Sequence, residues 1–70
     1  MSGNSRTKEF EAAWWTARQT TGDQFRNFAA VDEAMAWLRE QETLHGWIIR
    51  RRSTDGWRTV ASGTAADLHR

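Results

Sequence analysis

Five of the 70 residues are tryptophan and none is cysteine, so the chain must fold around a small aromatic core without disulfide bonds. A folded chain of this length buries only about 60% of the surface that its unfolded form exposes, which leaves little surplus stability. We therefore expect a single domain with most of its tryptophans inside. We also expect a homodimer, because association stabilises a fold whose own margin is thin.

The composition argues against catalysis and against a membrane protein. A chain without cysteine has no thiol nucleophile and no cysteine-based zinc site. The two histidines, His45 and His69, form no cluster with metal-ligand spacing, and the glycines match no nucleotide-binding fingerprint. All apolar runs are far shorter than the roughly 18 residues of a membrane span. We therefore predict a soluble cytoplasmic protein that is not an enzyme and binds no cofactor or metal.

Residues 31–42 predict an amphipathic helix. Apolar residues recur at the i, i+3, i+4, i+7 spacing that places them on one helical face. Asp32 and Glu33 lie in the first turn, where the helix dipole favours negative charge, and Gly46 offers a stop beyond the other end. The apolar face consists of Val31, Ala34, Met35 and Leu38.

Residues 46–62 predict a β-hairpin, because β-branched and aromatic residues flank a Thr-Asp-Gly turn at 54–56. A three-residue loop that closes on Gly56 separates most aromatic residues from most basic ones, whereas a two-residue Asp55-Gly56 loop mixes the faces. We prefer the three-residue loop. One face then holds Trp47, Ile49, Trp57 and Ala61, and the other holds Arg50, Arg52 and Arg58 beside Ile48 and Val60.

The first third of the chain has two interpretations. Strand-forming residues at 14–21, a turn at 21–23 and a return at 24–28 predict a first hairpin. Helical spacing of Phe10, Ala13, Trp14 and Ala17 predicts a helix instead. We favour the hairpin, which makes the fold α+β, a ββαββ domain with one helix packed on a four-stranded antiparallel sheet. The alternative is an N-terminal helix, a second helix and then a basic β-hairpin wing.

We divide the chain into a flexible N-terminal arm at 1–8, a single α+β domain at 9–64 and a C-terminal tail at 65–70. The helix should pack its apolar face on one side of the sheet and leave the other side available for a partner. We expect Trp37 in the core and Trp14 and Trp57 on the surface. The sheet residues predicted to contact the helix are Trp15, Phe28, Trp47, Ile49 and Ala61.

The net charge of +1 hides two opposed halves. Residues 1–42 carry five basic and seven acidic side chains, a balance of −2, whereas residues 43–70 carry five basic and two acidic ones, a balance of +3. Four of the basic residues in the second half are arginines of the predicted hairpin, and arginine is suited to phosphates, guanine edges and carboxylates. The predicted binding residues are Arg50, Arg51, Arg52, Arg58, Trp57 and Trp14.

Two stretches, each about a quarter of the chain, resemble segments of known DNA-binding families. Residues 22–38, with Phe28, the pair Glu33-Ala34 and the pair Trp37-Leu38, look like the hairpin-then-helix arm-type domain of phage tyrosine integrases. Residues 44–61 look like the wing of MarR-type winged-helix repressors. Both resemblances imply DNA binding, and we assign the chain to neither family.

These observations predict a small binding module. The first hypothesis is DNA binding or regulation through the arginine-rich hairpin, with arginine on phosphates and tryptophan on sugar or base. The alternative is a protein-binding inhibitor or adaptor, of the type that phages and mobile elements encode, such as an anti-defence protein. It would use the same surface on an acidic protein partner, because arginine and tryptophan are enriched at interface hot spots.

Overall fold

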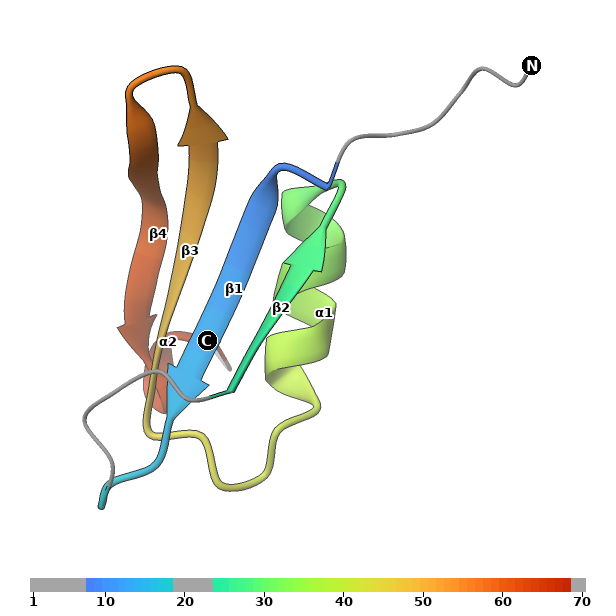
Figure 1. Ribbon diagram of the computed structural model, residues 1–70. Helices are drawn as coiled ribbons and strands as arrows, with labels where there is room; N and C mark the ends of the chain where they lie inside the picture. Colours follow the sequence, from blue (N-terminus) through green and yellow to red (C-terminus); the bar gives the residue numbers. More distant parts are fainter. Residues whose placement is uncertain (1–7, 19–23, 69–70) are drawn as a thin grey trace.

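The computed structural model describes residues 8–18 and 24–68 and confirms the α+β interpretation, a ββαββ core of one antiparallel sheet with a helix packed on it (Figure 1). The alternative with an N-terminal helix is wrong, because residues 10–15 form a strand in the interior of the sheet. The elements are β1 (Phe10–Trp15), β2 (Gln24–Phe28), α1 (Val31–Arg39), β3 (Gly46–Ser53), β4 (Gly56–Thr64) and α2 (Ala65–Leu68).

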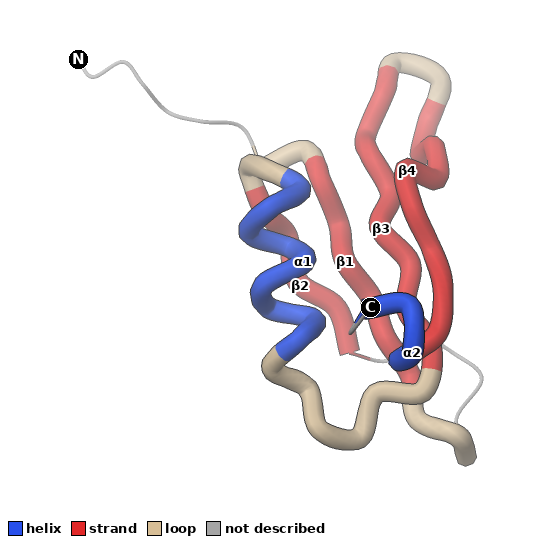
Figure 2. Tube along the Cα trace, turned by 180° about the vertical axis from the view of Figure 1, so that it is seen from behind, coloured by secondary structure: helices blue, strands red, loops and turns tan. Residues whose placement is uncertain are grey.

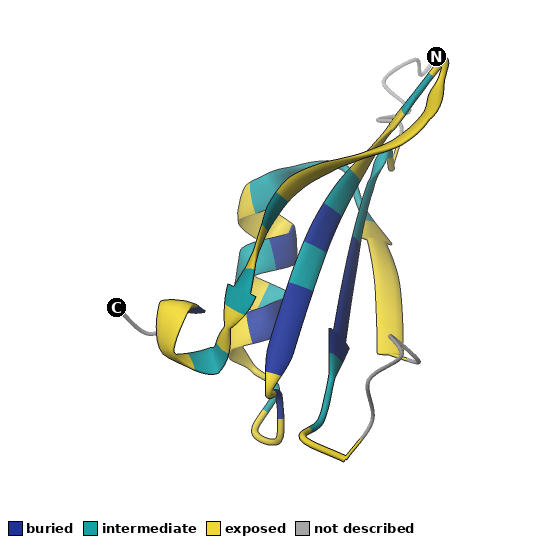
Figure 3. Ribbon diagram, turned by 90° about the vertical axis from the view of Figure 1, so that its left-hand side faces the viewer, coloured by how far each residue is buried: buried dark blue, intermediate teal, exposed yellow. Residues whose placement is uncertain are grey.

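The four strands lie in the order β2-β1-β3-β4, and every neighbouring pair is antiparallel. Both helices lie on the same side of this sheet (Figures 2 and 3). We call that side the covered face, to which β1 contributes Phe10, Ala12 and Trp14. The opposite side, to which β1 contributes Glu11, Ala13 and Trp15, is the open face. Among the described residues no helix or strand packs on the open face.

The core lies between α1 and the covered face. Ala34 and Leu38 of the helix and Ile49 of β3 are fully buried there. The predicted helical face is confirmed, because Val31 and Met35 pack against the same cluster. Of the sheet residues predicted to face the helix, Trp47 and Ile49 belong to this cluster, and Phe28 and Ala61 pack against it.

Trp14, rather than Trp15, contributes the β1 tryptophan of the core. Trp14 is only 9% exposed and belongs to the buried cluster, so our expectations of Trp14 at the surface and Trp15 under the helix are both wrong. Successive strand residues point to opposite faces. Trp14 therefore shares the covered face with Phe10 and Ala12, whereas Trp15 lies on the open one.

The helix α1 ends at Arg39, three residues before the predicted end at Glu42. The backbone N–H groups of Glu40 and Gln41 donate to carbonyls three residues back, those of Trp37 and Leu38, which tightens the last turn. The Gln41 side chain also donates to the Trp37 carbonyl. The chain then turns Leu44 into the core, and Gly46 begins β3 instead of stopping the helix.

Residues 65–68, which we expected to belong to a tail, pack against the domain. Residues 65–68 form α2, whose Leu68 is 4% exposed within the core cluster. Asp67 accepts a hydrogen bond from the Thr64 backbone N–H at 2.8 Å, as in a capping box, and Arg39 Nε donates to the Leu68 carbonyl. The described packing therefore extends beyond the boundary at 64 that we expected. The predicted turn at 21–23 and most of the predicted arm, residues 1–7, lie outside the described residues.

Candidate nucleic-acid interface

The β3–β4 hairpin, residues Gly46–Thr64, carries the predicted arginines and is called the arginine hairpin below. Ser53 pairs with Gly56, so the turn is the two-residue Thr54-Asp55, followed by Gly56 at φ +120°. A β-bulge interrupts the ladder further down, because Ile49 pairs with Ala61 while Arg50 pairs with Thr59. The extra residue is Val60. Bulges increase the local twist of a hairpin and redirect the side chains on either side of them.

The bulge changes which side chains share a face at the tip of the arginine hairpin. Below it, Trp47, Ile49 and Ala61 lie on the covered face as predicted. Beyond it, Trp57 pairs with Arg52 on the open face, and Arg58 pairs with Arg51 on the other side. The predicted register is therefore wrong at the tip, because the extra residue is at Val60 and not in the loop.

Arg51 and Arg58 lie directly opposite each other on neighbouring strands. Like charges in such cross-strand positions repel and destabilise the sheet. Each guanidinium makes one ion pair, Arg51 with Glu9 at 3.5 Å and Arg58 with Asp55 at 3.8 Å. Such exposed pairs contribute little to stability. A shallow groove of about 370 Å³ runs beside the two arginines and Arg52. An anion bound in this groove would relieve the repulsion.

Arg50 and Trp57 form a separate cluster on the open face. Arg50 makes an ion pair with Glu11, its direct cross-strand neighbour on β1. Its guanidinium carbon also lies 5.9 Å from the centre of the Trp57 ring, within the range of a cation–π contact. Trp57 nevertheless remains 44% exposed. Arg50 therefore holds Trp57 in place, whereas Arg52, for which the described part of the chain shows no ion pair, is available to a partner.

The open face carries two further aromatic side chains that the sequence interpretation missed as site residues. Phe25 of β2 is 62% exposed, and Trp15 of β1 lies against Gly46 of β3. The signal was the Trp14-Trp15 pair, since one member of such a pair in a strand must point away from the core. Beside these aromatics, Ala13 lies between Phe25 and Ile48 in the pairing register and contributes to an apolar floor.

Gly46 makes room for the Trp15 ring. A β-carbon at position 46 would lie 2.6 Å from Trp15 Nε1, so the Gly46→Ala substitution must displace the indole. We expect it to lower the free energy of unfolding by about 1–3 kcal/mol, as overpacking does. Urea denaturation measures this cost. The cost should disappear when Trp15 is also replaced by alanine, and an equal cost in both backgrounds would contradict the contact.

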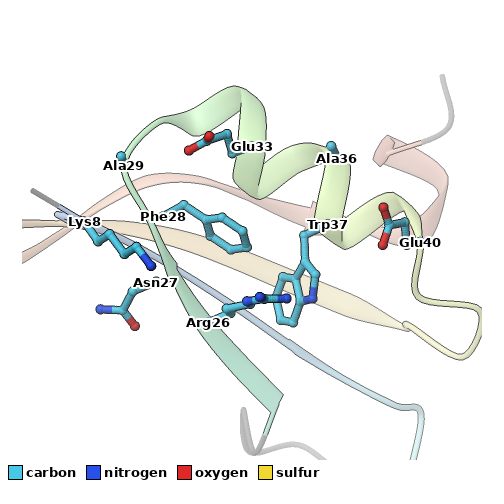
Figure 4. A pocket seen from close by; sticks show the side chains of 9 residues that line it. All are labelled: Lys8, Arg26, Asn27, Phe28, Ala29, Glu33, Ala36, Trp37 and Glu40. Carbon is cyan, nitrogen blue, oxygen red and sulfur yellow. The ribbon is translucent and has the colours of Figure 1, made fainter. Parts of the chain in front are cut away.

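A second groove, of about 590 Å³, lies between β2 and α1 on the covered side (Figure 4). Phe28 and Trp37 pack together here with ring centres 5.5 Å apart. The groove has two cationic and two acidic side chains at its rim, so it favours neither sign of charge. Its lining residues are Lys8, Arg26, Asn27, Phe28, Ala29, Glu33, Ala36, Trp37 and Glu40.

The described residues contain no group of histidine, aspartate or glutamate side chains that could hold a metal ion. Within the same residues, no helix is long and apolar enough to cross a membrane. His45 is exposed, and its backbone joins two elements, since its N–H donates to the Trp15 carbonyl and its carbonyl accepts from Ala65. Comparisons with protein-family models, with curated proteins and with solved structures found no match.

Proposed function

We propose that this chain is a non-catalytic DNA-binding module that contacts phosphates through the tip of the arginine hairpin. The observation that carries the proposal is the cross-strand pair of Arg51 and Arg58 beside Arg52. These three side chains are exposed, and the only acidic residue of the hairpin segment is Asp55. A concentrated positive charge of this kind suits the phosphate backbone of nucleic acid.

The shape of the arginine hairpin supports this proposal. The pairing between β1 and β3 ends near Phe10 and Arg51, whereas β3 and β4 continue to the turn at Thr54-Asp55. The tip therefore projects beyond the rest of the sheet (Figure 1). A two-stranded ribbon fits the major groove of DNA, and arginine there can contact both phosphates and guanine edges.

The test is the salt dependence of binding to random-sequence duplex DNA. We expect a Kd in the micromolar range at low salt, because that is typical of charge-driven binding. Replacing Arg51, Arg52 and Arg58 by alanine should reduce the slope of log K against log salt by about 2 to 3, since each lost phosphate contact removes about 0.9. Fluorescence anisotropy across a salt series measures both quantities, with circular dichroism to confirm that the variant is folded.

A matched control removes the same amount of charge elsewhere. Lys8, Arg18 and Arg26 are cations outside the arginine hairpin, and replacing all three by alanine changes the net charge equally. The control variant should keep most of the slope. Equal losses of slope in both variants would show that binding depends on overall charge and not on the arginine hairpin. Absence of binding even at low salt would reject the proposal.

A second candidate function is inhibition or adaptation of a larger protein through the same surface. Trp57 is an exposed aromatic side chain whose ring centre lies 5.9 Å from the Arg50 guanidinium carbon, and this combination is typical of interface hot spots. Binding to an acidic protein would depend on Trp57 and would persist at salt concentrations that abolish DNA binding. A pull-down washed at high salt separates the two functions, because charge-driven DNA binding is lost there, and the Trp57→Ala bait tests whether a retained protein partner uses this surface.

A further inference from the structure

The open face differs in chemistry from the tip of the arginine hairpin. It has aromatic side chains at three places, Phe25 on β2, Trp15 on β1 and Trp57 on β4. The helices lie entirely on the other side of the sheet (Figure 3). The exposed aromatic side chains of this face can therefore contact a partner without any movement of the described fold.

The centre of the open face is apolar and the cations lie towards one end. In the pairing register Phe25 lies opposite Ala13, Ala13 opposite Ile48, and Ile48 opposite Ser62. No charged side chain occurs in this row. Ala13 is only 4% exposed although no helix or strand within residues 8–18 and 24–68 covers it, so its larger neighbours on the open face shield it from water. This row offers nothing to a phosphate and suits the flat, apolar face of an aromatic ring.

The cations of the open face flank Trp57 in a way that suits stacking. Arg50 lies 5.9 Å from the centre of the Trp57 ring, and Arg52 is its direct cross-strand neighbour. Arg50 is itself positioned by Glu11. The phosphate of a nucleotide whose base stacks on Trp57 would therefore lie within reach of Arg52. Arg51, on the opposite face of the same strand, could contact a neighbouring phosphate at the edge of the hairpin.

We propose that the open face binds single-stranded DNA, with bases stacked on Trp57 and Phe25 and the backbone following the arginine hairpin. This proposal rests on the DNA-binding function proposed above and names the form of nucleic acid that the site prefers. A duplex hides the faces of its bases inside the stack, so it can satisfy the arginines but not the aromatic side chains. A single strand satisfies both, and stacking on an aromatic side chain strengthens binding by about 5- to 100-fold per base.

The dimensions of the sheet fit a short single strand. Phe25 and Trp57 lie on the two edge strands, three strand spacings apart, or about 14 Å at 4.8 Å for each spacing. They are also offset along the strands, because Phe25 lies in the row of Ile48 whereas Trp57 pairs with Arg52, four residues or about 13 Å further along β3. Crossing this distance requires a strand of several nucleotides. A flexible single strand can run obliquely across the sheet, whereas a rigid duplex cannot place two of its bases there.

The experiment compares the full chain on oligothymidine of about 12 nucleotides, on oligouridine of the same length and on duplex DNA, by fluorescence anisotropy at one salt concentration. We expect single strands to bind at least about 10-fold more tightly than the duplex. The Phe25→Ala variant should lose about 5-fold or more on single strands and keep its affinity for the duplex. Phe25→Trp should restore binding, and Gln24→Ala, which truncates an exposed non-aromatic side chain on the covered side of the same strand, should have no effect. Oligouridine is the RNA comparison, and we expect it to bind no more tightly than oligothymidine.

Three outcomes would overturn the proposal. Duplex binding as tight as single-strand binding would overturn it while leaving the proposed function of the arginine hairpin intact. Equal losses of affinity for single strands and for duplex in the Phe25→Ala variant would also overturn it, because base stacking would then not be the cause of the loss. A dimer in sedimentation experiments that dissociates in the Phe25→Ala variant would show that a second copy occupies the open face. Failure to bind any of the three nucleic acids would instead reject the function itself.

Discussion

The Trp14→Ala substitution is expected to remove a large fraction of the free energy of unfolding, whereas Trp57→Ala leaves most of it in place. Trp14 is 9% exposed and packs in the cluster that joins the sheet to α1. Removing a buried tryptophan side chain costs about 3–5 kcal/mol, the lost transfer energy plus the cavity that remains. A domain of this size has a free energy of unfolding of roughly 3–10 kcal/mol, so the loss is a large fraction of the total.

Trp57 is the control for this prediction, because both tryptophans are strand residues and both were expected at the surface. Its ring is 44% exposed at the tip of the arginine hairpin, outside the core cluster. We expect its replacement by alanine to cost less than about 1.5 kcal/mol, well below the cost of a core tryptophan. Urea denaturation followed by circular dichroism measures both values. Similar costs for the two variants would contradict the assignment of Trp14 to the covered face.

The Leu68→Ala substitution is expected to lower the free energy of unfolding by about 2–5 kcal/mol. Leu68 is 4% exposed and closes the core cluster beside α1. Its removal would also weaken α2, a helix of only four residues that has little stability of its own. The contact between Arg39 Nε and the Leu68 carbonyl, which joins the two helices, should be lost with it.

The matched control for Leu68→Ala is Leu68→Met, which keeps the volume and costs less than about 1.5 kcal/mol. Thermal unfolding ranks the two variants, and amide hydrogen exchange at residues 64–68 reports whether α2 opens. A Leu68→Ala variant as stable as the starting protein would show that the segment after Thr64 is a tail, as the sequence alone had led us to expect.

Much of the fold follows from local patterns. The helix was predictable because Val31, Ala34, Met35 and Leu38 repeat at helical spacing, and this pattern requires no knowledge of the rest of the chain. The second hairpin was predictable from strand-forming residues around a Thr-Asp-Gly turn. The exact end of the helix was not predictable in the same way. It depends on Leu44 leaving the helix to reach the core.

The candidate site was only partly predictable. The sequence brings Arg50, Arg51 and Arg52 together, and any hairpin through these residues would gather positive charge. It does not show that Arg58 lies opposite Arg51, because that register depends on the bulge at Val60. One extra residue in a strand exchanges the two faces beyond it, and a loop or a bulge can absorb that residue equally well in the sequence.

The sequence by itself therefore determined α1, the hairpin of β3 and β4 and the location of the arginines, whereas it left residues 10–15 open between helix and strand and did not indicate α2. Only the tertiary structure decided which side of each strand is covered. Alternation places Trp14 and Trp15 on opposite faces, but both are large and apolar, so nothing local distinguishes the buried one. The choice depends on α1 and on strands β2 and β3, which pair with β1 from distant parts of the chain. Whether a side chain is buried depends on how the sheet and the helix pack together. The aromatic residues of the open face could therefore be assigned only from the folded structure.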